Sequence, residues 1–83
     1  MTAIQIFRKP KKSEVAKAKI AFAKAIYNKR VYFGISQQLL GEIAGVDRKT
    51  INRIENGHFF PNLDTIIRLS TVLKIQPNKF LKI

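Results

Sequence analysis

The stretch SQQLLGEIAGVDRKTINRIENG, residues 36–57, decides how this chain folds. It predicts two short helices joined by a tight turn at Gly45 and Val46, because each half carries its own start signal and its own apolar spacing. Ser36 and Asp47 suit the N-caps of these helices, since their side chains accept hydrogen bonds from N–H groups that a first helical turn leaves unpaired. Two capped helices around a tight turn form a helix-turn-helix.

Apolar side chains recur at helical spacing in both halves of the stretch, so each helix is expected to bury one face. Gly41 lies inside the first helix, where glycine costs about 1 kcal/mol of helix propensity relative to alanine. A close approach between the two helices would account for it. The shared faces are expected to hold Leu39, Leu40 and Ile43 on the first helix, with Leu40 and Ala44 toward the core, and Thr50, Ile51 and Ile54 on the second.

The order of these residues resembles the DNA-binding domain of the phage repressor and Cro family, also called the Cro/CI or XRE type. The resemblance rests on Ser-Gln-x-x-Leu, Ala-Gly-Val and Thr-Ile-x-Arg-Ile-Glu-Asn-Gly, followed by Pro61 and an apolar helix, and it covers about residues 20–81. It implies an all-α, compact five-helix bundle of the lambda-repressor type. The chain departs from the family pattern at Gly41, where the family usually has alanine, and in the residues before the match.

Further helices are expected on both sides of the motif. Ser13 suits an N-cap for a helix over residues 14–31, and Asn62 suits the cap of a helix that follows it. Pro77 at a first helical position indicates a short fifth helix near the end of the chain. The helix over residues 14–31 is apolar on more than one side, which indicates packing against the core and also against the N-terminal segment or a partner chain.

Residues 1–12 are predicted to form a basic N-terminal tail or arm, and residues 13–83 the DNA-binding domain. The weak alternation of residues 2–7 is compatible with a short strand or a disordered tail. The run from Arg8 to Lys12 is broken by Pro10, and it is either an arm along DNA phosphates or a solvated linker. As an arm, Lys11 and Lys12 are the candidate phosphate contacts.

The charge of the chain points to a polyanionic partner. Sixteen Lys and Arg residues against five Asp and Glu residues give a net charge of +11, and most of it falls on residues 1–30. Duplex DNA is the expected partner once a helix-turn-helix is present. The chain has no cysteine, which fits a reducing compartment. It also has no apolar run of membrane-spanning length, so no membrane partner is expected. These features predict a cytoplasmic protein, and the family resemblance implies one that is bacterial or phage-encoded and associates with the nucleoid when bound.

The second helix of the motif is expected to lie in the major groove, where its outward side chains reach base edges. Arginine can bond guanine with two hydrogen bonds and asparagine can do the same for adenine, each pair giving about 1 to 3 kcal/mol of discrimination. Asp47 is expected to cap this helix without touching bases. The candidate base contacts are Arg48, Lys49, Asn52 and Arg53.

The family resemblance implies three further roles. Gln37, in the first turn of its helix, and Asn56 are expected to contact DNA phosphates. Arg30 is expected to form a structural salt bridge with Glu55, and the alternative is an Arg30 that is free to touch DNA. Breaking such a buried pair would cost roughly 3 to 5 kcal/mol.

The predicted function is a sequence-specific transcriptional regulator, a repressor, that binds a two-fold DNA operator as a homodimer. The half-sites would lie about 34 Å apart, one turn of duplex. No enzyme activity, cofactor, metal or small-molecule substrate is expected, because His58 is the one histidine and no nucleophile, carboxylate pair or phosphate-binding loop accompanies it. The alternatives are an antitoxin-like or adaptor module with a protein partner, and a basic protein that binds nucleic acid through phosphates alone.

Overall fold

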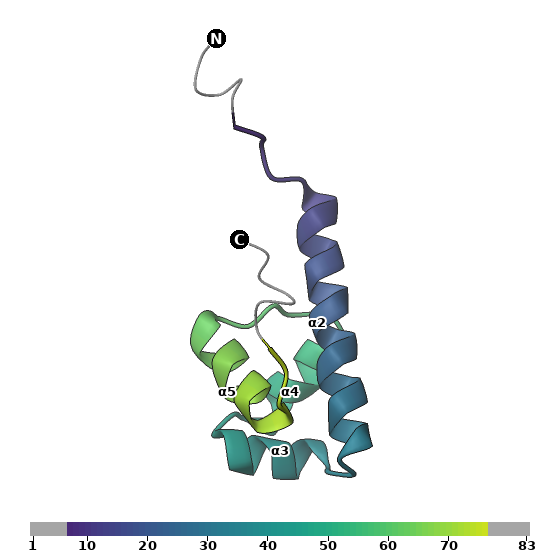
Figure 1. The fold of residues 1–83 in the computed structure, drawn as a ribbon, viewed down its shortest axis with the longest axis vertical. Coiled ribbons are helices and arrows are strands. Elements are labelled where there is room, and N and C mark those ends of the chain that lie inside the picture. Colours follow the sequence, from purple (N-terminus) through teal and green to yellow (C-terminus); the bar gives the residue numbers. More distant parts are fainter. Residues whose placement is uncertain (1–6, 77–83) are drawn as a thin grey trace.

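The computed structural model describes residues 7–76, and these residues form four α-helices. They are α2 (Lys12–Tyr32), α3 (Gln37–Ala44), α4 (Arg48–Glu55) and α5 (Leu63–Leu73), shown in Figure 1. The all-α class is confirmed, but the described part of the chain holds four helices where five were predicted. The helix expected at Pro77 lies outside the described residues, and so do residues 1–6, on which the short strand or tail was considered.

The core lies where the four helices meet. Buried side chains of α2 pack against those of the three shorter helices, and the Phe22 ring stacks on Phe60, with 5.8 Å between ring centres. Burying these apolar surfaces is the main stabilising contribution, roughly 1.5–3 kcal/mol for each large side chain. The core side chains are Phe22, Ile26, Leu40, Ala44, Ile51, Ile54, Ile66, Leu69 and Leu73.

One predicted apolar face is wrong. Leu40 and Ala44 are buried as expected, but Leu39 and Ile43 do not share their face and remain 41% and 56% exposed. The short helix α3 buries a stripe of residues four apart, and each residue just before this stripe is turned away from it by about 100°. Leu39 and Ile43 therefore face solvent on the described surface.

The turn between α3 and α4 depends on two glycines. Gly45 ends α3 in the left-handed conformation, with φ of 70°, which favours a residue without a side chain. Gly41 is buried, and a Cβ atom there would lie 2.4 Å from the carbonyl oxygen of Val46. The close approach expected from Gly41 therefore exists, and its partner is the backbone of the turn.

The predicted helix caps divide into two groups. Ser36 accepts a hydrogen bond from the N–H of Leu39 at 3.0 Å, and Asn62 caps α5 in the same way. Asp47 does occupy the N-cap position of α4, but its carboxylate accepts no capping hydrogen bond. Ser13 lies inside α2, which begins at Lys12. The expectation for Ser13 fails because Lys11 takes the N-cap position, so Ser13 already lies in the first helical turn. At α4 the first turn is exposed, and water can satisfy the N–H groups that Asp47 leaves unpaired.

The first half of α2 stands clear of the bundle. No residue of α2 before Phe22 is buried, and Figure 1 shows this part of the helix extending past α3, α4 and α5. We call residues 12–21 the α2 arm. An exposed ion pair between Arg8 and Glu14 lies at its start. None of the helices in residues 7–76 combines the length and the apolar character that crossing a membrane requires.

Candidate nucleic-acid interface

A buried ion pair joins the end of α2 to the end of α4. Arg30 Nε donates to Glu55 Oε2 at 2.7 Å, and Arg30 Nη2 donates to Glu55 Oε1 at 2.9 Å. The two side chains are only 13% and 4% exposed. Hydrogen bonding to Glu55 raises the pKa of Arg30 above its ordinary value, although burial opposes this. Arg30 also donates to the carbonyl oxygen of Ile35 at 3.0 Å, so the pair fixes α2, α4 and the loop before α3.

Three amide side chains continue from this pair toward the surface. Gln37 Nε2 donates to Glu55 Oε1 at 3.1 Å, and Gln37 Oε1 accepts from Asn52 Nδ2 at 3.3 Å. Asn56 Nδ2 then donates to Asn52 Oδ1 at 3.1 Å and to the Asn52 carbonyl oxygen at 2.9 Å. We call these five residues, Arg30, Glu55, Gln37, Asn52 and Asn56, the polar network.

The network bears on the two expected phosphate contacts. A phosphate oxygen accepts hydrogen bonds, so a side chain that binds it must offer a donor. The side-chain donors of Asn56 point back to Asn52, and the atom it leaves available is an acceptor. Gln37 is half-buried, and its amide contacts Glu55 and Asn52. In this structure Gln37 bonds to the buried carboxylate of Glu55, and Asn56 bonds to Asn52 on the surface of α4.

The outer face of α4 carries the four candidate base contacts. Ile51 and Ile54 are buried on the inner face, while the opposite side of the helix is exposed. Within residues 7–76, the side chains of Arg48 and Lys49 make no hydrogen bond or ion pair, whereas the Arg53 guanidinium lies 5.2 Å from the centre of the Phe59 ring. The exposed side chains are Arg48, Lys49, Asn52 and Arg53.

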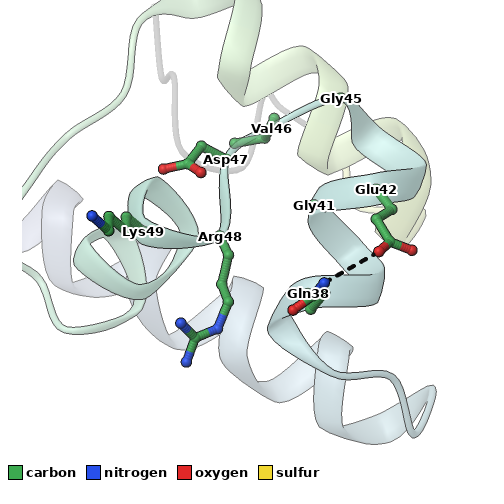
Figure 2. A pocket seen from close by; sticks show the side chains of 8 residues that line it. All are labelled: Gln38, Gly41, Glu42, Gly45, Val46, Asp47, Arg48 and Lys49. Atoms are coloured by element: carbon green, nitrogen blue, oxygen red, sulfur yellow. Dashed lines mark hydrogen bonds between the residues drawn. The ribbon is translucent and has the colours of Figure 1, made fainter.

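A groove of about 590 Å³ runs between α3 and the start of α4. Figure 2 shows Arg48 and Lys49 projecting from the start of α4, while Gln38 and Glu42 lie together on α3, joined by a 3.4 Å hydrogen bond. Asp47 adds a second carboxylate to the lining. The two carboxylates offset the charge of Arg48 and Lys49 in this lining, so the groove has no net charge with which to attract a phosphate. Its two cations are directed outward, where a ligand larger than the groove would meet them.

Lys11 and Lys12 lie far from the rest of the candidate interface. Lys12 begins α2 and Arg30 lies near its end, so the two are about 27 Å apart along the helix axis at 1.5 Å per residue. Figure 1 shows that the α2 arm leads away from α3 and α4. The structure therefore brings together the sites on α3 and α4 but not the basic residues at the start of α2.

Sequence reasoning missed the link between Gln37 and Asn52. The sequence did indicate the contact between Asn52 and Asn56, because they are four residues apart on one helix and so share a face. The partner on α3 could not be found in this way, since 15 residues separate it from Asn52.

Together, these features define a class of protein: a small helical domain that presents the exposed side of one helix on a helix-turn-helix scaffold. The chain belongs to the HTH_3 helix-turn-helix family, whose model matches residues 26–80. This is a family of DNA-binding transcriptional regulators.

Two curated relatives are named as uncharacterized HTH-type transcriptional regulators. One, from Haemophilus influenzae, is 35% identical over 65 residues, which are 78% of this chain and 65% of the relative. The other, YgzD of Bacillus subtilis, is 50% identical over 34 residues, which are 41% of this chain and 52% of the relative. The chain thus spans less than two thirds of the length of either relative.

Two solved structures share the fold. The restriction-modification controller protein C.AhdI from Aeromonas hydrophila superposes with a TM-score of 0.69 at 28% identity, over 77% of this chain and 97% of that protein. An HTH_3 family transcriptional regulator from Vibrio cholerae gives a TM-score of 0.71 at 22% identity, over 81% of this chain and 38% of that protein. The second likeness concerns the fold alone.

Proposed function

We propose that the protein is a sequence-specific, duplex-DNA-binding transcriptional regulator that places the start of α4 in the major groove. The observation that carries this proposal is the pair of exposed cations Arg48 and Lys49, which have no partner within residues 7–76. The opposite face of the same helix is held in the core by Ile51 and Ile54. Arginine and asparagine on such a face can each bond a base edge with two hydrogen bonds.

Phosphate contacts would position this helix on the duplex. We assign them to the edge of the motif, where Gln37 and Asn56 lie, and to Lys11 and Lys12. Because the arm places these lysines about 27 Å from Arg30, they would meet phosphates well away from those beside α4. Binding by Gln37 or Asn56 requires the amide to turn a donor outward from the polar network.

We further propose that the regulator is a cytoplasmic, bacterial or phage-encoded homodimer that represses transcription from a two-fold operator. Leu63 and Ile67 support a dimer, since they lie one turn apart on α5 and are 58% and 47% exposed. Exposed apolar surface of this kind is typical of an interface. A dimer would place its two recognition helices about 34 Å apart in successive major grooves. The likeness to a restriction-modification controller protein supports a regulatory role.

A second candidate function is an antitoxin-like or adaptor module whose main partner is a protein. The observation that favours it is a row on the outer side of α2, where Ile20, Tyr27 and Val31 are each about half exposed. Spacings of seven and four residues place them on one face. This face could cover an apolar surface of another protein.

In vitro selection from a random duplex library tests the proposed function. Enrichment of a two-fold sequence is the expected result, and sedimentation of the protein with this duplex should give two chains per site. A library that shows no enrichment, together with a protein that binds random duplexes equally, would contradict sequence-specific regulation and favour the protein-partner candidate.

A further inference from the structure

The hydrogen bonds of the polar network can form in only one arrangement of donors and acceptors, and the buried ion pair sets this arrangement. The Arg30 guanidinium has only donors, and the Glu55 carboxylate has only acceptors. Gln37 must therefore turn its NH₂ group toward Glu55, where Nε2 lies 3.1 Å from Oε1. Turning the amide over would set its oxygen against a carboxylate oxygen that is already held by Arg30.

The orientation of the Gln37 amide in turn sets the orientation of Asn52 on the outer face of α4. Because the nitrogen of Gln37 donates to Glu55, its oxygen faces Asn52. Asn52 must therefore donate to this oxygen, and its Nδ2 does so at 3.3 Å. The oxygen of Asn52 is thereby left on the side of Asn56, whose nitrogen donates to it at 3.1 Å. Reversing Asn52 would face two acceptors on one side and two donors on the other.

We propose that Gln37 is a positioning residue for DNA specificity, which transmits the polarity of the Arg30–Glu55 pair to the carboxamide of Asn52 and fixes the orientation in which Asn52 meets base edges. The inference rests on the proposed function. The amide of Asn52 keeps one N–H and one oxygen lone pair beyond its network bonds, and this donor and acceptor match the major-groove edge of adenine.

Burial explains why this control should be effective. Glu55 is 4% exposed and Gln37 is half-buried, so water competes little for their hydrogen bonds, whereas Asn52 is exposed. A free carboxamide on an exposed helix can rotate and offer either edge to a base. One that is held from the inside offers a single edge, so it avoids the entropy cost of being ordered on binding.

A double-mutant cycle on DNA distinguishes positioning from phosphate binding. The variants are Gln37→Leu, Asn52→Ala and the two together, with dissociation constants measured on a selected site and on a scrambled duplex of equal length and salt. Asn52→Ala should weaken the selected site by about 5- to 150-fold. Gln37→Leu should weaken the selected site by a smaller factor. Loss of a Gln37 phosphate contact would weaken both duplexes equally, so positioning is measured by the ratio of the two dissociation constants. By this ratio the double variant should match Asn52→Ala alone.

The contrary result is equally clear. If Gln37 only binds a phosphate, Gln37→Leu will weaken both duplexes by the same factor, and its effect will multiply with that of Asn52→Ala. This outcome overturns the inference and leaves the proposed function intact. Equal binding of both duplexes by the unaltered protein overturns the proposed function itself. Gln38→Leu is the matched control, because Gln38 contacts only Glu42 among the described side chains, and it should change neither affinity.

A measurement on the free protein separates positioning from loss of structure. In the unaltered protein the side-chain NH₂ group of Asn52 should give proton resonances displaced from those of an unrestrained asparagine amide, with the ¹⁵N relaxation of an ordered side chain. In Gln37→Leu these resonances should approach those of an unrestrained amide while the backbone spectrum stays folded. An Asn52 amide that is equally mobile before and after the substitution contradicts the inference whatever the DNA measurements give.

Discussion

The helix-turn-helix and the α2 arm are both helical and both carry basic side chains, but they are stabilised in different ways. In the motif, a buried ion pair joins α2 to α4, Gln37 of α3 donates a hydrogen bond to its carboxylate, and Ser36 caps α3. In the arm, no side chain is buried, no side chain caps the helix, and the Arg8–Glu14 pair is exposed. Tertiary contacts therefore hold the motif, whereas the arm depends mainly on local helix propensity.

The largest expected effect is on the free energy of unfolding, when the buried ion pair of the motif is broken and compared with the exposed pair of the arm. Glu55→Ala leaves Arg30 buried without its carboxylate, and we expect the free energy of unfolding to fall by roughly 3 to 5 kcal/mol. Glu14→Ala removes the exposed partner of Arg8 and should cost about 1 kcal/mol or less. Urea unfolding followed by circular dichroism measures both. Equal losses for the two variants would show that burial does not distinguish the regions.

Gly41 gives the next effect. Gly41→Ala adds a methyl group 2.4 Å from the Val46 carbonyl oxygen, and we expect this overpacking to lower stability by about 1 to 3 kcal/mol. The matched change in the α2 arm is Ala21→Gly, which should cost about 1 kcal/mol through helix propensity alone. Thermal unfolding of both variants checks the comparison. A Gly41→Ala variant that is more stable than the original would show that the turn accepts the alanine typical of the family.

The two N-caps of the motif should differ by a smaller amount. Ser36→Ala removes a capping hydrogen bond of 3.0 Å and should cost about 1 kcal/mol. Asp47→Ala removes a side chain that accepts no capping bond, so its effect should stay within about 0.5 kcal/mol. The midpoints of chemical unfolding decide between them, and a larger loss at Asp47 would contradict the capping geometry described above.

The smallest effect is expected for the arm on DNA. Lys12→Ala removes one charge from an exposed position far from α4, so it should weaken all duplexes by a similar small factor. The slope of log affinity against log salt should also fall by about 1. Fluorescence anisotropy over a salt series measures this slope. An unchanged slope would mean that the arm makes no phosphate contact through Lys12.

Local signals explain what the sequence could predict. The cap at Ser36, the turn at Gly45 and the apolar spacing of Ile51 and Ile54 each act within a few residues, and each was placed correctly. The inward face of α3 was harder, because a two-turn helix with Leu39 and Leu40 side by side has two possible apolar faces. Only packing against the other helices decides between them.

Long-range polar contacts explain what the sequence could not predict. The family resemblance proposed Arg30 and Glu55 as a pair, and the structure joins them across 25 positions. Nothing local indicates that Gln37 and Asn52 extend this pair, since their amide orientations follow from the carboxylate beneath them. The sequence also could not predict that the Asp47 side chain makes no capping hydrogen bond. Residue type alone does not settle whether a side chain turns toward the helix N-terminus.

The most direct test of the central claim is the dissociation constant of Arg48→Ala on a selected duplex and on random duplex at the same salt concentration. If the outer face of α4 reads bases, the variant should lose about 5- to 150-fold on the selected duplex and far less on random DNA. Equal losses on the two duplexes would contradict base recognition by Arg48.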